Sequence, residues 1–440
     1  MTGDPYAPDL MAAVFDYSPI TKHVLAEAKV LMISPWALLG SCLAQAAIAT
    51  PWDWLLPPTI GKAAVINPLV LSVGPSGAGK GIASAPVLEW PDTDPMNLDF
   101  SNGEQQLADA FTPLTPGSGE GISALFRESR TTRVDGHNVT TQEWVRRAAW
   151  IDFPEIDQLA AISSRAGATM SAEIRKVWSG EPLGTMTKVK ANQLMVPAHS
   201  YRAVVTVGAQ PLRCGPLLAE EAGGTLQRVL WLSADDPAPE LRDEDPSTMR
   251  VDLPDWSPGP ITTPGPHYFT LADEVRLEIR ENKRDRLWQG TEDSHRNLVK
   301  LKAAAACAVL HGTTEITSEV WAWAEALMTH SRLVRASVRR ELYQETVEQL
   351  AKQAAYQART AITSASSREL TVEKVAKAIE RWMRRNAGQG ATANSLRQAA
   401  VRAGDRSLVS EALDHLLAVG SVVESGKSRT GTPVYKMATP

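Results

Sequence analysis

Runs of apolar residues mark the parts of the chain that a buried sheet would use. Residues 69–73 form one such run, and later runs cover residues 148–153, 201–207 and 228–232. Helical or irregular stretches separate these runs. Continuous apolar runs of strand length are typical of parallel strands that are buried on both faces. The pattern therefore predicts an α/β fold around a parallel sheet.

Helical patterns come before the first of these strands. A helix capped by Ser18 is expected over residues 19–32, and a second helix is expected over residues 35–49. Residues 30–50 carry no charge and are long enough to span a bilayer. An internal proline and scattered polar residues favour a core helix there instead. We therefore expect no membrane partner.

The C-terminal part has its own pattern. A helix is expected over residues 371–386 and a short one over residues 394–403. Ser407 would cap a further helix that runs to residue 418. Short strands over residues 421–425 and 433–437 then enclose a basic turn. Two helices followed by a basic hairpin are typical of a winged helix.

Composition divides the chain into regions of different character. A stretch rich in proline and acidic residues reads as a linker without a core of its own. The helical patterns after it, over residues 298–310, over 318–330 and from residue 332 onward, suit a helical lid. The expected regions are an N-terminal helical region (1–60), an α/β core (61–235), the linker (236–266), the lid (267–365) and a winged-helix domain (366–440).

Charge and cysteine content limit the classes of function. The chain has 440 residues and a formal net charge of -5, so a basic surface for nucleic acid would have to be local. Its three cysteines are far apart and have no zinc-binding spacing, which indicates a reducing compartment. The N-terminus has no basic segment followed by an apolar one, so we expect a cytoplasmic protein without an export signal.

The first predicted strand ends at a glycine-rich turn that ends in a lysine. Glycines there let backbone N–H groups approach an anion, and the lysine would reach the β- and γ-phosphates of a nucleotide. The alternative is an ordinary glycine-rich turn. The last position holds glycine where Ser or Thr normally offers a hydroxyl group to Mg²⁺. The predicted cofactor-binding residues are Gly74, Pro75, Ser76, Gly77, Ala78, Gly79, Lys80 and Gly81.

Carboxylates follow the second predicted strand. Glu155 is the expected catalytic base that orients the attacking water. Pro154 stands where the metal-binding Asp is expected, and Asp152 points to the same side of the strand as Pro154. Asp152 is therefore the predicted ligand of Mg²⁺, and Asp157 is the reserve candidate. The alternative is a strand end with solvated acidic residues.

Two further side chains would complete a nucleotide site. Gln210 follows the third predicted strand and would contact the γ-phosphate or the water; a plain exit from the strand is the alternative. Arg228 opens the fourth strand and would reach a γ-phosphate that is held by a neighbouring subunit. A structural ion pair is the alternative for Arg228.

This order of motifs resembles the AAA+ ATPases, and residues 171–211 are similar to their minichromosome-maintenance and superfamily III helicase branch. That branch inserts a β-hairpin before the polar-tipped strand and points it into the pore of a ring. Here the hairpin would cover residues 184–196, with Lys188 and Lys190 on one face near its tip. A solvated surface hairpin is the alternative.

The chain looks still more like the helicase-like ATPases of actinobacterial phages and integrative elements. The shared segments are residues 56–58, 60–62, 74–81, 153–157 and 295–309. The resemblance implies a hexameric ring that binds ATP and Mg²⁺ between subunits and single-stranded DNA in its pore. Gly81 and Pro154 depart from the general pattern on the metal side.

The lid and the tail supply further basic candidates. Arg296, beside Lys300 and Lys302, is the predicted second phosphate sensor, and ordinary surface charge is the alternative. Lys427 and Arg429 would bind DNA on the wing of the C-terminal domain. Acidic residues on the expected recognition helix would repel phosphate, so a winged helix that contacts protein is the alternative.

These observations favour an ATPase that drives a DNA helicase or translocase in replication of a phage or mobile element. The alternative is an ATP-binding replication initiator or helicase loader that remodels DNA without unwinding it, and the missing Mg²⁺ hydroxyl group favours it. A third hypothesis, a P-loop kinase acting on a small molecule, does not account for the predicted hairpin, lid and winged helix.

Overall fold

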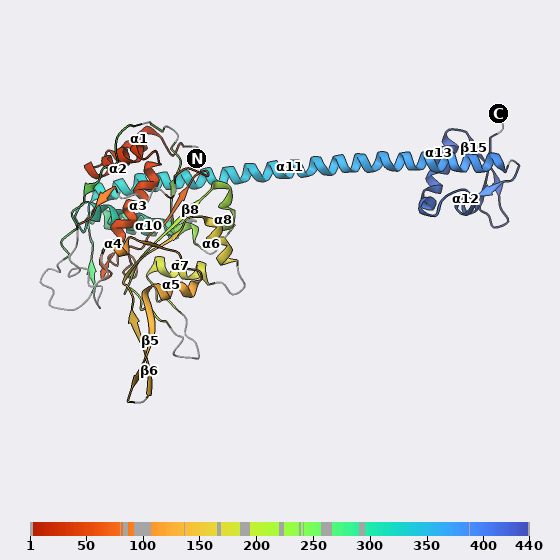
Figure 1. Ribbon diagram of the computed structural model, residues 1–440. Helices are drawn as coiled ribbons and strands as arrows, with labels where there is room; N and C mark the ends of the chain where they lie inside the picture. Colours follow the sequence, from red (N-terminus) through yellow and green to blue (C-terminus); the bar gives the residue numbers. More distant parts are fainter. Residues whose placement is uncertain are drawn as a thin grey trace. The chain divides into compact units, whose positions relative to one another are not determined.

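The computed structural model describes residues 3–79, 81, 87–91, 107–135, 137–164, 169–184, 194–219, 224–236, 239–240, 242–256, 266–289, 295–386 and 388–438. The chain forms two compact units, Met1–Tyr343 and Gln344–Pro440. Helix α11 (Ser318–Arg385) belongs to both units (Figure 1). The described part is mixed α/β with a central parallel sheet, as the apolar runs predict.

The central sheet has five parallel strands in the order β4-β7-β8-β2-β9. The chain leaves β2 for the far edge, returns towards β2 strand by strand, and finally passes it to reach β9. The predicted strands are confirmed, with small shifts at their ends. The strands are β2 (Leu69–Val73), β4 (Pro113–Leu114), β7 (Ala148–Phe153), β8 (Arg202–Ala209) and β9 (Val229–Ser233).

One face of this sheet is covered by α3 (Pro35–Ile48), and α10 (Arg296–Leu310) packs against α3. Every residue of α3 is buried, which explains why its sequence carries no charge. A side chain at Gly40 would place its Cβ 2.6 Å from Leu232, so glycine allows the helix to approach the sheet. The predicted core helix is thus confirmed. No helix in the described part of the chain is long and apolar enough to cross a membrane.

The opposite face of the sheet is covered by α6 (Ile156–Ser163) and α7 (Met170–Ser179). The short helix α8 (Gly215–Ala219) follows β8 and lies beside them (Figure 1). Helix α5 (Gly119–Phe126) packs on α7 and leads into a long antiparallel hairpin, β5 (Arg127–Val134) with β6 (His137–Trp144). The sequence analysis did not predict this hairpin. It extends from the body of the first unit.

The N-terminal helices α1 (Pro8–Phe15) and α2 (Pro19–Val30) belong to the same compact unit as the sheet. The Ser18 hydroxyl oxygen accepts a hydrogen bond from the Thr21 N–H, so the predicted cap is confirmed. The helix ends two residues early because Met32 takes a left-handed conformation, with φ of 53°.

Residues 236–266 are not a linker without a core. Strand β10 (Met249–Arg250) pairs with β3 (Leu88–Glu89), and the Val251 N–H donates to the Glu89 carbonyl. Val251 is fully buried and Trp256 packs edge-on against Trp54. The described part of this stretch is therefore attached to the first unit by backbone pairing and by apolar burial.

The expected lid differs from the prediction in two ways. Besides α9 (Asp273–Gln289), it contains α10, which is buried against α3 and is a core helix. The segments expected as separate helices after residue 318 form the single helix α11. Short strands join the region to the first unit: β11 (His267–Tyr268) pairs with β1 (Trp54–Leu55), and β12 (Thr270–Leu271) pairs with β13 (Glu315–Ile316).

The second unit ends in a small helical and antiparallel arrangement. Its helices are α12 (Ala393–Ala399) and α13 (Val409–Ala418). Its sheet has the order β14 (Ala391–Thr392), β16 (Pro433–Met437), β15 (Val422–Lys427). Ser407 does not cap α13, because a 3₁₀ turn over Ala403–Leu408 precedes that helix. The end of α11 supplies Val375, Ile379 and Met383 to the core of this unit.

His330 ties α11 to the sheet and to the N-terminal segment. Its Nε2 accepts a hydrogen bond from the Ser233 N–H at 3.2 Å, and its Nδ1 contacts the Pro5 carbonyl at 3.0 Å. The ring stacks on Trp36 with 3.6 Å between centroids. Burial lowers the pKa of His330 to about 3, and the hydrogen bond to Pro5 opposes that shift.

We expect stability to fall as the pH drops from about 6.5 towards 4, because the unfolded chain binds a proton on His330 that the folded chain excludes. The expected loss in the free energy of unfolding from this group is on the order of 3 kcal/mol between pH 7 and pH 4.5. Urea unfolding of the wild type and of His330→Gln at both values measures it. A variant with the same pH dependence as the wild type would show that His330 is not responsible.

Candidate functional site

The candidate site lies at the edge of the sheet where its parallel strands end. Strand β8 lies between β2 and β7, and Val73 at the end of β2 pairs with Ala209 and with Ser233. The Gly74 N–H donates to the Ala209 carbonyl at 3.0 Å, which fixes the start of the glycine-rich turn. Parallel sheets bind ligands outside the carboxyl ends of their strands, where the strand order reverses. Strand β2 is at such a point.

The glycine-rich turn requires glycine at several positions. Gly77 and Gly79 have φ of 84° and 74°, in the left-handed region that other residues avoid. A Cβ at Gly79 would lie 2.6 Å from the Ile33 side chain, and a Cβ at Gly74 would lie 3.0 Å from that of Ala234. The turn is therefore shaped by its glycines. Lys80 lies outside the described residues.

The described residues show no long helix directly after this turn. Gly81 lies in a turn, and residues 87–91 include β3. Only residues 82–86, which are outside the described part, lie between them. A long helix that presents its N-terminus to phosphate would add a favourable dipole. Anion binding here would depend instead on the N–H groups of the turn and on Lys80.

Two cavities flank the turn. The first has a volume of about 230 Å³ and lies between the sheet and α3. The second, of about 570 Å³, lies over the first half of the turn and falls in the size range of small-molecule sites. Polar or charged residues of the first cavity are Ser41, Ser72, Asp152 and Thr206, and those of the second are Tyr6, Ser76, Gln210, Ser233, Asp235, Ser337 and Glu341.

Asp152 faces the smaller cavity together with Gly81 and Pro154. The predicted orientation, on the same side as Pro154, is confirmed. The Thr206 hydroxyl donates to Asp152 Oδ1 at 2.5 Å and itself accepts from Trp150 Nε1 at 2.8 Å. Burial raises the pKa of Asp152, and the hydrogen bond from Thr206 opposes that shift. A partly buried carboxylate of this kind is stabilised by a nearby cation.

These residues fit Mg²⁺ in the way that nucleotide enzymes hold it. Mg²⁺ usually takes one or two carboxylates, substrate phosphates and several waters. Asp152 supplies one partly buried carboxylate to the cavity that Gly81 also lines, and Gly81 supplies no hydroxyl group. Within the described ranges no cluster of three potential metal-ligating side chains occurs. These residues therefore fit Mg²⁺ that is bound together with a nucleotide, whose phosphates would supply further ligands.

Glu155 and Asp157 stand at the start of α6. Glu155 is exposed, occupies the N-cap position and does not cap the helix with its side chain. Asp157 pairs with Arg213 at 3.7 Å, and both side chains are more than half exposed. This pair connects the start of α6 to the segment after β8. Asp157 is thus engaged away from the small cavity, while Glu155 lies at the carboxyl edge of the sheet.

The segment after β8 carries Gln210 and Arg213. Gln210 lines the larger cavity next to the glycine-rich turn, as expected for the polar tip of the strand beside the acidic one. Arg213 was not predicted as a site residue. The available signal was its place three residues after Gln210, at the carboxyl end of a buried strand. It is an exposed cation at the candidate site.

Arg228 lies at the opposite end of the sheet, where its parallel strands begin. It ends a 3₁₀ turn (Leu226–Arg228) and precedes the first residue of β9, whereas the glycine-rich turn follows the last residue of β2. Its Nη1 donates to the Gly224 carbonyl at 2.6 Å, and its guanidinium group lies 5.3 Å from the Trp178 ring centroid. Burial lowers the pKa of Arg228. This placement separates Arg228 from the turn of its own chain.

Arg296 also lies away from the turn. It pairs with Glu325 of α11. Lys302 follows Arg296 by less than two turns of α10, and its side chain is buried. Its Nζ donates to the backbone carbonyls of Asn67 and Trp178. Asn67 precedes β2, so this end of α10 is near the amino-terminal edge of the sheet. The structure does not bring Arg296 to the phosphate side of its own chain.

The expected pore hairpin falls mostly outside the described residues, and Lys188 and Lys190 are among those outside. At its base, Leu183 and Val196 form an antiparallel bridge. The Arg127 guanidinium group donates to the Met195 carbonyl at 2.8 Å, and the Met195 N–H donates to Gln142 Oε1 at 3.2 Å. The described base of the expected pore segment therefore lies against the β5–β6 hairpin, near the start of β5 and the end of β6.

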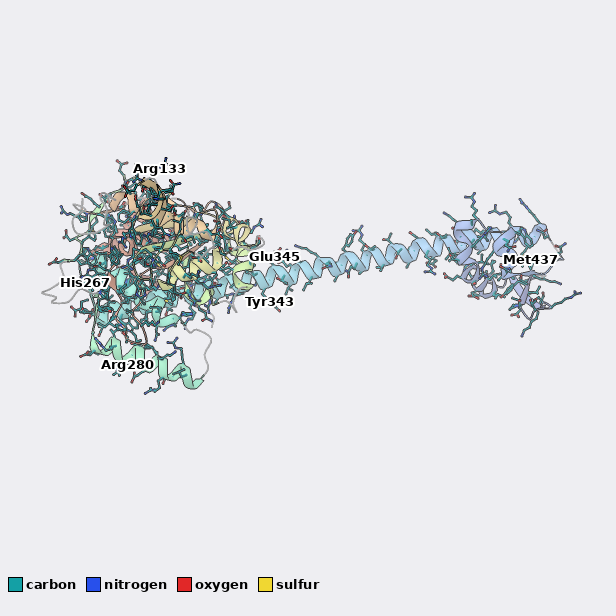
Figure 2. The ribbon with its side chains drawn as sticks, turned by 90° about the horizontal axis from the view of Figure 1, so that it is seen from below. Arg133, His267, Arg280, Tyr343, Glu345 and Met437 are labelled. Atoms are coloured by element: carbon teal, nitrogen blue, oxygen red, sulfur yellow. The ribbon has the colours of Figure 1, made fainter. Side chains whose placement is uncertain are left out.

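The β5–β6 hairpin has two different faces. Cross-strand pairing places Glu128 opposite Glu143 on one face. The other face has no acidic residue, and Arg133 stands one pair before the last pair of the ladder (labelled in Figure 2). Extended, exposed polar faces with a cation near the tip suit contact with a phosphate backbone. The residues of the acid-free face between Arg127 and Trp144 are Ser129, Thr131, Arg133, Asn138, Thr140 and Gln142.

In the second unit, Lys427 ends β15 and Arg429 lies in the turn before β16. Both side chains are exposed. Glu411 on α13 pairs with Arg368, whose Nη2 and Nε donate to its two carboxylate oxygens at 2.6 and 3.2 Å. Arg368 thus compensates one of the acidic residues that would repel phosphate from this helix.

We expect the double substitution Lys427→Ala with Arg429→Ala to weaken DNA binding about tenfold at low salt and to reduce the salt slope by about 2, because two phosphate contacts are lost. Fluorescence anisotropy at several salt concentrations measures both quantities. Lys352→Ala, on the exposed part of α11, is the matched control. An unchanged affinity for the double variant would favour a protein-binding role for this hairpin.

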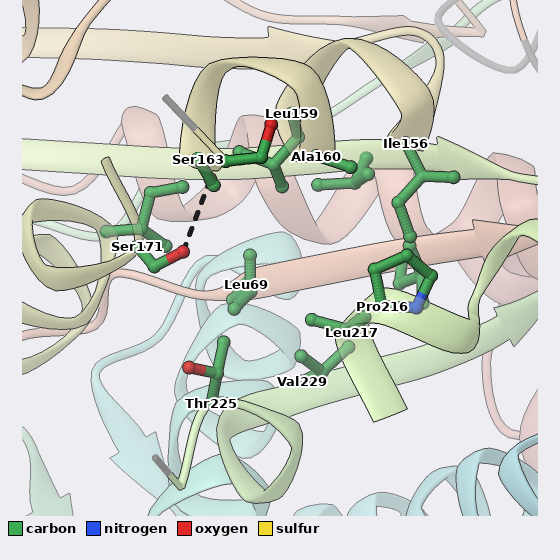
Figure 3. A pocket seen from close by; sticks show the side chains of 14 residues that line it. Leu69, Ile156, Leu159, Ala160, Ser163, Ser171, Pro216, Leu217, Thr225 and Val229 are labelled. Atoms are coloured by element: carbon green, nitrogen blue, oxygen red, sulfur yellow. Dashed lines mark hydrogen bonds between the residues drawn. The ribbon is translucent and has the colours of Figure 1, made fainter. Parts of the chain in front are cut away.

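A third cavity, of about 170 Å³, lies on the opposite face of the sheet, between the sheet and α6, α7 and α8 (Figure 3). Leu69, Val229, Ile156 and Leu159 line it, and its polar groups are hydroxyls such as those of Ser163 and Ser171, which are hydrogen-bonded at 3.3 Å. No charged side chain of the described residues lines it. It is unsuited to phosphate.

Comparison with known proteins does not add a family to these observations. No protein-family model matches the chain. A search of curated proteins found no significant match. The residues and their geometry therefore carry the functional argument.

Proposed function

We propose that the chain is an ATPase that drives a DNA helicase or translocase, related to the minichromosome-maintenance and superfamily III branch of AAA+ enzymes. The observation that carries the proposal is the arrangement of the groups at the carboxyl ends of the sheet's strands. A glycine-shaped turn follows β2, the polar tip of β8 lies beside it, and the acidic end of β7 comes next. This is the order that nucleotide binding, water activation and phosphate sensing require.

Each residue of this edge would have a distinct task. The N–H groups of the turn and Lys80 would bind the triphosphate. Glu155 would accept a proton from the attacking water, and Gln210 would orient the water or the γ-phosphate. Asp152 would hold Mg²⁺ in the smaller cavity, between the sheet and α3. The metal supplies compensation for charge that develops on the phosphate oxygens.

Arg228 would act on the nucleotide of a neighbouring subunit. Its position at the amino-terminal edge separates it from the turn of its own chain, and a guanidinium group that stabilises a transferred phosphoryl group can come from another chain. This role requires a homo-oligomer, which we propose to be a hexameric ring. Arg228 would have to exchange its bond to the Gly224 carbonyl for the neighbour's phosphate.

DNA would be bound by basic groups on three elements. Lys188 and Lys190 would follow the strand in the pore. The β5–β6 hairpin contacts the described base of that segment at Met195, and its acid-free face would add contacts to the same strand. The second unit, which we propose to be a winged helix, would add Lys427 and Arg429.

A second candidate is an ATP-binding replication initiator or loader that remodels DNA without unwinding it. Two observations favour it: Gly81 offers no hydroxyl group to Mg²⁺, and Pro154 directly follows β7, where a metal-binding Asp is expected. Both weaken the metal site on which rapid hydrolysis depends. Such a protein would use ATP for assembly and hydrolyse it slowly.

DNA-stimulated ATP hydrolysis together with strand displacement tests the proposal. The proteins to compare are the wild type, Lys80→Ala, and Lys188→Ala combined with Lys190→Ala. A helicase loses displacement in both variants, while only the first variant loses basal hydrolysis. Hydrolysis without displacement in the wild type would favour the initiator. Hydrolysis that DNA does not affect would contradict both candidates.

A further inference from the structure

The larger cavity beside the glycine-rich turn has a wall of acidic and apolar groups, to which the proposed phosphate-binding role assigns no task. Asp235 follows β9, and Glu341 belongs to α11. Apolar side chains of α11, among them Val334 and Val338, share the cavity. No Lys or Arg of the described residues lines it. The wall therefore suits a neutral group that donates hydrogen bonds, not a second phosphate.

Asp235 is held beside the turn by its backbone. In the sheet, Ser233 pairs with Val73, the residue before the turn, and the Ala234 N–H donates to the Val73 carbonyl at 2.6 Å. The Tyr6 hydroxyl donates to the Asp235 carbonyl at 2.9 Å, and the Asp235 N–H donates to Ser233 Oγ at 3.2 Å. These bonds engage the main chain and position the carboxylate next to the phosphate-binding segment.

Glu341 faces the same cavity from α11. Ser337 and Val338 lie three and four residues after Val334, and Glu341 lies four and three residues after them, so the four residues share one face of that helix. Glu341 thus stands one or two turns beyond the valines. The cavity is therefore lined by two carboxylates, those of Asp235 and Glu341, and by an apolar wall from α11.

A nucleotide meets these groups in a fixed order. Its phosphates bind the turn, its sugar comes next, and its base lies farthest from the turn. Carboxylates that stand beside a phosphate-binding turn accept hydrogen bonds from ribose hydroxyl groups in other nucleotide sites. We propose that Asp235 binds the 2′-hydroxyl group of the ribose in the cavity that Glu341 also lines, so that the site selects ribonucleoside triphosphates over 2′-deoxy ones. This inference rests on the proposed function.

The test compares the binding of ATP and of 2′-deoxy-ATP to the full chain by isothermal titration calorimetry. We expect the wild type to bind ATP about tenfold more tightly, the ratio that corresponds to one hydrogen bond to a charged group. Asp235→Asn should lose most of this preference through weaker binding of ATP, with 2′-deoxy-ATP bound as before. Glu345→Gln removes the same charge from α11 outside the cavity and should keep the preference.

The failure of this inference and the failure of the proposed function give different results. Equal binding of ATP and 2′-deoxy-ATP by the wild type would overturn the ribose assignment and leave an ATPase in place, and this comparison needs no variant. An equal loss of both nucleotides in Asp235→Asn would also overturn it, because the carboxylate would then contact a group that both share. A wild type that binds neither nucleotide would overturn the inference and the proposed function together.

Discussion

Replacing Glu155 by glutamine is expected to reduce ATP hydrolysis at least about a hundredfold, while the affinity for ATP stays within about twofold. The amide keeps the size of the side chain but cannot accept the proton of the attacking water. Glu155 does not cap α6 with its side chain, so the substitution removes no capping interaction from that helix. Steady-state hydrolysis and calorimetric binding of ATP measure the two quantities.

Asp157→Asn is the matched control, since it removes a carboxylate two residues away that pairs with Arg213 instead. We expect it to lower hydrolysis less than about threefold, as for an exposed ion pair. If Glu155→Gln hydrolysed ATP at the rate of the wild type, the base would have to be another group. A large loss in Asp157→Asn alone would transfer the assignment to that residue.

The second large effect concerns stability. Arg202, at the start of β8, is fully buried, and its guanidinium group donates to the carbonyls of Thr50, Pro51 and Trp54. Arg202→Met should lower the free energy of unfolding of the first unit by about 3–5 kcal/mol, because these buried acceptors lose their donors. That is a large part of the stability of an ordinary domain. Urea unfolding followed by tryptophan fluorescence measures it.

Arg130→Met is the control for this experiment. Arg130 is largely exposed on the β5–β6 hairpin and pairs with Glu143 at 3.3 Å. Its replacement should change stability by less than about 1 kcal/mol. Equal effects of the two substitutions would contradict the structural role of Arg202.

The strands of the sheet and the position of the glycine-rich turn could be predicted from sequence. A parallel strand buried on both faces must be apolar throughout, so the runs at 148–153 and 201–207 identified β7 and β8 directly. The alternation of side chains also placed Asp152 correctly on the side of Pro154. These are local properties, and the chain shows them without any tertiary context.

The position of the helices could not be predicted in the same way. The helical pattern over residues 298–310 suggested a lid, but α10 is a core helix in which Lys300 and Lys302 are buried. Lys300 pairs with Glu278 and Glu325, and Lys302 donates to backbone carbonyls. Their partners come from distant parts of the chain, so no local pattern reveals them. Arg296 was assigned to the phosphate side because the helix that it begins was expected to lie over the nucleotide.

The larger cavity also required the structure. Its walls combine Tyr6, Asp235 and Glu341, which are more than a hundred residues apart from one another in sequence. Glu341 stands in a run of charged residues that predicts only a solvated helix face. Its place beside the glycine-rich turn follows from the packing of α11 on the first unit. The sequence therefore identified the glycine-rich turn of the site but not the cavity that Tyr6, Asp235 and Glu341 line.

Calorimetric titration of ATP with Mg²⁺ into the wild type and into Lys80→Ala tests the central claim most directly. The account predicts saturable binding to the wild type and a loss of affinity of about a hundredfold or more in the variant, because the lysine reaches the β- and γ-phosphates. Equal affinities would contradict the assignment of the turn, and a wild type that took up no ATP would contradict the account as a whole.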